Sequence, residues 1–165
     1  MAAPSIAALL DYETNIEDAL KTYLEANIAS AQVLTTRTLL TSEETLETPR
    51  ITVAVQITGT NANHQAIRTT DSAQYDSHKV GTLTLVATMR RNASGQSMTT
   101  LRGGIRKAML AATAAFDGTN LPYYQIITLR EGSCNTSMSG DNDEISYVMS
   151  YSLEFYIKPD QWAVS

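Results

Sequence analysis

Residues 143–158, DEISYVMSYSLEFYIK, constrain the fold most strongly, because large apolar side chains occupy every second position. The alternating set is Ile145, Tyr147, Met149, Tyr151, Leu153, Phe155 and Ile157. A period of two predicts a β-strand with one buried face, since a helix would distribute these residues around its axis. At about 3.3 Å per residue the strand would be roughly 45 Å long, well above the usual length. We therefore expect this strand to be central in a sheet.

Four other segments have strand character. Residues 50–58 and 80–91 alternate apolar and polar side chains, and they predict an antiparallel pair. Residues 32–40 are rich in Val, Leu and Thr, which suit a pleated surface. Pro122 precedes a strand expected at 123–131. After a loop at 132–142, the long last strand would complete a second hairpin with it.

The first amphipathic helix is expected at residues 15–28. Thr14, with Glu17 three residues later, has the spacing of a capping box. Apolar residues then recur three and four positions apart, while Glu17 lies off that stripe. This pattern predicts a helix with one side to bury.

The second helix is expected at residues 98–116, with Ser97 as its cap. Its apolar stripe includes Leu101, Ile105 and Met109. Gly103 and Gly104 lie inside this helix, where each costs about 1 kcal/mol relative to alanine. The two glycines predict a close approach of the helix to another element.

Strands that come in pairs, rather than alternating singly with helices, indicate an α+β fold. We expect one domain spanning 1–165, with a four- to five-stranded, mostly antiparallel sheet and two helices packed on one face. The predicted core contains Leu20, Leu24, Leu101, Ile105 and Met109. The opposite face carries many Thr and Ser with Val86, Val148 and Tyr156, and such a partly apolar face is typical of an oligomer surface.

Two segments contain little that would enter this core. Residues 1–13 are interpreted as an N-terminal arm that either covers part of the core or packs on a neighbouring subunit. Residues 59–78, GTNANHQAIRTTDSAQYDSH, form a long polar flap between two strands. A loop of this length is often functional or disordered.

Charge and composition exclude several classes of protein. The net charge of −5 argues against broad nucleic-acid binding, which needs clustered Lys and Arg. The single cysteine, Cys134, excludes an internal disulfide framework and fits assembly in a cytoplasm. The sequence contains no apolar run of the roughly 20 residues that a membrane helix needs. It also lacks the glycine-rich phosphate loop and the GxSxG motif.

The few residues that could catalyse a reaction or bind a metal do not form a recognisable site. They are two histidines in the flap, one cysteine in a Gly/Ser loop and an acidic group: His64, His78, Cys134, Asp141, Asp143 and Glu144. The histidines lack the i, i+4 partners of helical metal ligands, and the acidic group lacks the glycine and distal glutamate of a calcium loop. We therefore predict a protein that is not an enzyme, with no catalytic, metal or cofactor-binding residues.

Basic residues gather near the end of the third strand and on the second helix: Arg90, Arg91, Arg102, Arg106 and Lys107. They are interpreted either as a salt-bridging surface or as an electrostatic interface with an acidic neighbour.

The order of elements resembles that of the tail terminator (tail completion) proteins of tailed bacteriophages. The resemblance covers about residues 10–162 and rests on the first helix, RITVAVQI, the polar flap, KVGTLTLVATMRR, TTLRGGIRKAMLAA and EISYVMSYSLEFYIKPDQW. It implies a structural virion protein of the tail or neck that caps the tail tube as a hexameric ring. Such a ring ends tube polymerisation and joins the head connector, and DNA passes through its lumen without specific recognition.

A terminator ring must close, so its subunits would meet head to tail through two different surfaces. We predict basic residues on one surface, acidic residues on the other and tyrosines that add apolar area. The candidate interface residues are Arg68, Arg90, Arg91, Arg102, Arg106, Glu43, Glu44, Glu47, Tyr123 and Tyr151.

Two alternatives remain open from the sequence. One is another virion position, such as a neck or stopper protein; a tube subunit is disfavoured because it would be all-β. The other is a small ligand-binding or hydrolytic α+β domain, which would have a deep pocket with a shifted titratable group.

Overall fold

Five strands form one sheet in the order β1-β2-β3-β5-β4. The computed structural model describes residues 11–37, 46–60, 78–90, 98–115, 124–138 and 144–157. In chain order the elements are helix α2 (Tyr12–Asn27), β1 (Gln32–Thr35), β2 (Arg50–Thr60), β3 (His78–Arg90), helix α4 (Met98–Ala115), β4 (Tyr124–Met138) and β5 (Glu144–Ile157). Residues 1–10 of the predicted arm and 61–77 of the predicted flap lie outside the described residues.

Strand β5 lies between β3 and β4, and it is antiparallel to both. Strands β2 and β3 are also antiparallel, whereas β1 runs parallel to β2, so the sheet is mixed. The predicted long strand, the predicted antiparallel pair and the predicted second hairpin are therefore confirmed. Each residue of β5 has a ladder partner on both sides over most of its length, as the central position of a long strand requires.

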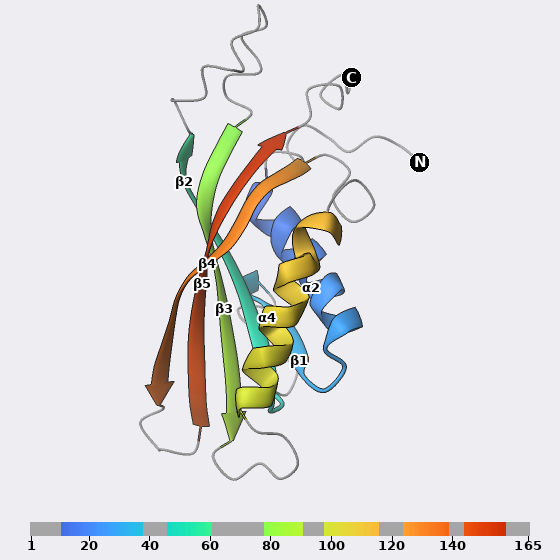
Figure 1. Ribbon diagram of the computed structural model, residues 1–165, viewed down its shortest axis with the longest axis vertical. Helices are drawn as coiled ribbons and strands as arrows, with labels where there is room; N and C mark the ends of the chain where they lie inside the picture. Colours follow the sequence, from blue (N-terminus) through green and yellow to red (C-terminus); the bar gives the residue numbers. More distant parts are fainter. Residues whose placement is uncertain are drawn as a thin grey trace, which may run out of the picture.

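Both helices pack on the same face of the sheet (Figure 1). Helix α2 contacts β1 and β2, and helix α4 contacts β3 and β4. The alternating apolar residues of the strands enter the layer between the sheet and the helices because successive side chains leave a strand on opposite faces. The α+β prediction is confirmed, and so is the predicted core: Leu20, Leu24, Leu101, Ile105 and Met109 are all buried.

Helix α2 begins one turn earlier than the sequence predicts. Its N-cap is Asp11, whose carboxylate accepts a hydrogen bond from the Thr14 amide at 3.4 Å. The predicted capping box is wrong because Glu17 points into the protein instead of back toward the helix start. Glu17 is only 6% exposed, and its carboxylate accepts the Val55 amide at 2.9 Å. Val55 lies just beyond the part of β2 that pairs with β1, because that pairing ends at Thr35 and Val53. The Glu17 carboxylate therefore takes the place of a backbone acceptor for the Val55 amide.

Two strands differ most in length from their predictions. Strand β1 is only four residues long, and the chain turns helical at Thr36. Strand β4 continues through 132–138, which the sequence predicts as loop. This Ser/Asn/Thr-rich part lacks an apolar alternation, but the first half of β5, from Ile145 to Ser150, pairs with it from Ser133 to Met138. Backbone pairing to a long neighbour thus extends an edge strand whose own side chains carry no strand signal.

Gly81 is needed for close packing of two strands. A Cβ at Gly81 would lie 2.3 Å from the Gln56 carbonyl oxygen, beside the register shift between Ile57 and Gly59. Gly81→Ala should lower the free energy of unfolding by about 1–3 kcal/mol, because backbone must move. Chemical denaturation measures this, with Gly103→Ala as the control. A Cβ at Gly103 would meet no atom within 4 Å, so the control should gain up to about 1 kcal/mol. Equal stability of the Gly81 variant and the wild type would contradict the close approach.

Candidate interaction surfaces

The predicted basic cluster is divided between two faces of the molecule. Arg90 follows the buried Met89, so its side chain leaves β3 on the face away from the helices. Arg102 and Arg106 lie one turn apart on α4, on the helix-covered side. The three arginines therefore do not form one patch, and Arg91 lies outside the described residues.

Arg106 is held within its own subunit. Its guanidinium donates to both carboxylate oxygens of Glu131 on β4, at 2.7 to 3.1 Å. The hydrogen bonds to Glu131 raise the pKa of Arg106 above its ordinary value. Both side chains are substantially exposed, so this ion pair contributes little to stability.

Arg102 lies over the ring of Tyr147, with its guanidinium carbon 4.5 Å from the ring centroid. Tyr147 is on the helix-facing side of β5 and packs against the core. This stacking positions the charge of Arg102 between α4 and β5. Within the subunit, Arg106 thus makes an ion pair, as the salt-bridging interpretation expects, and Arg102 makes a cation–π contact instead.

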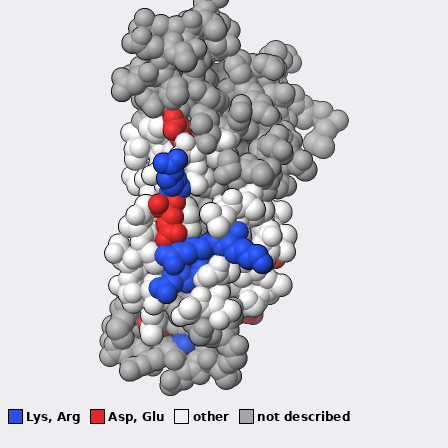
Figure 2. All heavy atoms as spheres, viewed as in Figure 1, with Lys and Arg blue, Asp and Glu red and all other residues white. Residues whose placement is uncertain are grey.

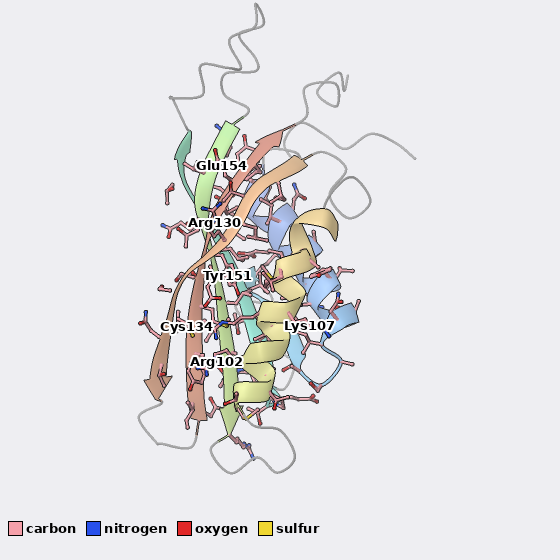
Figure 3. All side chains as sticks on the ribbon, viewed as in Figure 1. Arg102, Lys107, Arg130, Cys134, Tyr151 and Glu154 are labelled. Atoms are coloured by element: carbon pink, nitrogen blue, oxygen red, sulfur yellow. The ribbon has the colours of Figure 1, made fainter. Side chains whose placement is uncertain are left out.

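Charges of both signs follow one side of the molecule (Figure 2). Arg130 and Glu154 lie on the upper half of β4 and β5 in Figure 3. The Glu154 carboxylate also accepts from the Thr128 hydroxyl at 3.2 Å. Strand β4 is an outer strand of the sheet, with two register shifts. Charges and bulges on an outer strand discourage edge-to-edge pairing with other sheets.

A second group of charges lies at the end of the sheet near Arg90. Arg50 donates to both oxygens of Glu144 at 2.9 and 3.2 Å, and this bonding, with the nearby charge of Arg90, lowers the pKa of Glu144. Arg50 also donates to the Glu47 carbonyl at 3.4 Å. Glu47, from the predicted acidic side, thus lies at the same end of the sheet as Arg90, from the predicted basic side.

Tyr151 does not belong to a subunit surface. Its side chain is 3% exposed in the core under α4, and burial raises the pKa of Tyr151 to about 12. Its hydroxyl is buried without a hydrogen-bond partner among the described residues. The prediction that Tyr151 adds apolar area between subunits is therefore wrong, because the helix-facing alternation of β5 includes it. The other predicted interface residues, Arg68, Tyr123, Glu43 and Glu44, lie outside the described residues.

The face of the sheet away from the helices carries small side chains. No helix in the described ranges covers it. The Thr88 and Ser146 hydroxyls bond each other across β3 and β5 at 2.8 Å. The central rows are uncharged and half-buried: Thr52, Ala54, Thr84, Val86, Val148 and Ser150. This face is uncharged in the middle, with Arg90 and the Arg50–Glu144 ion pair toward one end and Glu154 toward the other.

The outer side of α4 is a surface that the sequence analysis missed. Leu110 is 87% exposed there, and Gly103 and Lys107 share its side of the helix. The signal was available, because Leu110 falls outside the apolar stripe of this helix. The predicted close approach at Gly103 and Gly104 is not found within the described part of the subunit: a Cβ at either position would meet nothing within 4 Å.

A hollow of about 350 Å³ lies between the C-terminal end of α2 and the first half of α4. Its lining residues are Asn27, Ile28, Ala29, Ser30, Thr100, Leu101 and Gly104. None of these side chains titrates near neutral pH, so the hollow lacks the shifted acid or base that a hydrolytic domain would need.

The described residues contain few other groups that could catalyse a reaction or bind a metal. Cys134 is a half-buried free thiol on β4. No group of three or more His, Cys, Asp and Glu side chains in the described ranges could hold a metal ion. Neither of the helices that the structure describes is long and apolar enough to cross a membrane.

No protein-family model matches this sequence, and a search of curated proteins found no similar one.

Proposed function

We propose that this chain is a structural virion protein that caps a phage tail tube as a ring, ends tube polymerisation and forms the joint to the head connector. In this role it has no catalytic residue and no cofactor. Its partners are further copies of itself, the tube protein and a connector or neck protein. It assembles in the cytoplasm of the host bacterium, and DNA passes through the ring without specific recognition.

The observation that carries the proposal is the one-sided architecture of the subunit. Both helices cover one face of the sheet, and no described helix covers the other. The middle of that second face is built of uncharged side chains, with Arg90, Glu144 and Glu154 toward its ends, so its central part can lie against another protein surface without burying an unpaired charge. The element order that resembles tail terminators supports the same role.

Loss of the protein tests the proposal in the phage that encodes it. Without it, tail tubes should grow beyond their normal length and heads should remain unjoined, as electron microscopy would show. Addition of the purified protein to such an extract should restore joined particles. Normal tails in the absence of the protein would overturn the proposal.

Charge reversal on α4 should disrupt the assembly without unfolding the subunit. The double variant Arg102→Glu, Arg106→Glu should be monomeric in native mass spectrometry, because it places two negative charges on the side of α4 that is proposed to meet an acidic neighbour. It should keep its circular dichroism spectrum, because the ion pair and the cation–π contact that it removes lie on the surface of α4. The matched control reverses the internal pair, with Arg106→Glu and Glu131→Arg. If the variant with both changes assembles whereas Arg106→Glu alone does not, Arg106 supports assembly only through its ion pair with Glu131. A double variant that still assembles would exclude these arginines from the interface.

A further inference from the structure

We propose that subunits meet head to tail through α4, with Leu110 of one copy inserted into the hollow between α2 and α4 of the next copy. The inference deepens the proposed function and rests on it for the purpose of the assembly. The contact itself is argued from the exposed leucine, the two glycines, the hollow and the charges around them.

Leu110 is the most exposed large hydrophobic side chain in the described part of the chain, at 87%; the other is Leu46, at 52%. A single exposed leucine is common on protein surfaces and needs no explanation alone. On α4, however, it shares its side with Gly103, so the helix has a protruding side chain and a bare backbone stretch two turns apart. A partner can therefore approach the helix backbone closely.

The glycines have no packing reason within the described subunit. Glycine is unfavourable inside a helix, and it is useful where another backbone or ligand comes close. A Cβ at Gly104 would meet no atom within 4 Å. Gly104 instead lines the hollow, which a larger side chain at this position would fill. The missing side chain keeps the hollow open.

The hollow suits an aliphatic side chain. Its lining carries no charge, and Ile28, Ala29 and Leu101 give it apolar walls. Gly104 and Leu110 are six positions apart, which is about 120° around the helix. The hollow and the leucine therefore face different directions. Such a pair joins copies through two different surfaces, as a closed ring requires.

The charges around the two halves are complementary. Lys107 is exposed one turn from Leu110 on α4. The hollow lies at the C-terminal end of α2, where the helix dipole is negative and the last turn has no basic residue; the exposed Glu25 is already ion-paired with Lys21 one turn earlier. Lys107 of the incoming subunit would supply the cation that this helix end lacks. A second copy of the chain thus fits the hollow in both shape and charge.

A variant that fills the hollow tests the subunit contact without disturbing the fold. Gly104→Leu should leave the subunit at least as stable, since leucine favours the helix and its Cβ has free space. The same change should weaken self-association at least about tenfold in sedimentation experiments, because the neighbour's leucine loses its site. Leu110→Asp should weaken association to the same degree. The matched control is Leu46→Asp, at the other exposed leucine, which should not. Unchanged association of the Gly104 or Leu110 variant would overturn the contact.

Cross-linking identifies the geometry in the purified protein. In a Cys134→Ser background, Ala29→Cys combined with Leu110→Cys should give a ladder of disulfide-linked oligomers on oxidation. The variant with Leu110→Cys alone should form no disulfide-linked oligomers. No ladder at the highest soluble concentration, or dimers only, would overturn the head-to-tail contact. A ladder from a protein whose loss leaves phage tails normal would overturn the proposed function and leave the contact in place.

Discussion

Replacing Ile105 or Leu20 with alanine should lower the free energy of unfolding by about 2–5 kcal/mol. Both side chains are fully buried where the helices meet the sheet, so alanine would remove apolar contacts and leave a cavity. Leu110→Ala is the matched control on the same helix as Ile105. Because Leu110 is exposed, this control should change the stability of the monomeric subunit by less than about 0.5 kcal/mol.

Urea denaturation of the purified variants measures these differences, provided that the subunit concentration is held constant. The slope of the transition should stay the same while its midpoint falls. An unaltered midpoint for either core variant would show that the helix in question does not pack where the structure has it.

Glu17→Ala should destabilise the protein by about 1–3 kcal/mol, because the Val55 amide would lose its acceptor inside the protein. Glu17→Gln keeps an acceptor oxygen and removes the charge, so it should cost far less. Comparison of the two variants separates the hydrogen bond from the charge. Equal loss in both would mean that the carboxylate charge, and not the acceptor, supports the fold.

The same residue predicts a pH dependence. Burial raises the pKa of Glu17 above its ordinary value of 4.5, although the bonds from Val55 and Thr36 partly oppose this. A raised pKa in the folded state means that folding is favoured when Glu17 is protonated, and that this advantage is lost as the pH rises through the raised value.

The stability of the wild type relative to Glu17→Gln should therefore fall as the pH rises from about 4.5 toward neutral. Denaturation curves of both proteins across this range would show it, and other titrating groups cancel in the difference. A constant difference would show that Glu17 has the same pKa in both states.

The predictions from sequence succeeded where a periodic pattern reports burial directly. The alternation in β2, β3 and β5 identified these strands and their buried faces, and the stripes of α2 and α4 identified the core residues. These patterns are reliable because a one-residue change of register would turn every apolar side chain toward solvent. The two predicted antiparallel pairs then limited the strand orders that the sheet could adopt.

The sequence did not predict the role of a residue where that role depends on partners distant in the chain. Glu17 looks like a solvated cap residue until β1 ends and exposes the Val55 amide to it. The polar residues 132–138 carry no strand signal, and only pairing with β5 extends β4 through them.

The candidate surfaces show the same division. The sequence identified basic residues on β3 and α4, but the alternation of side chains along β3 and the position of α4 assign them to opposite faces of the sheet. It also predicted a close approach at Gly103 and Gly104, which the described part of the subunit does not show; only the packing of α2 against α4 creates the hollow at Gly104. The sequence by itself determined the elements and their buried sides, because those follow from local periodicity. The tertiary structure alone decided which polar groups meet and where the surface is hollow, because these depend on contacts between residues far apart in the chain.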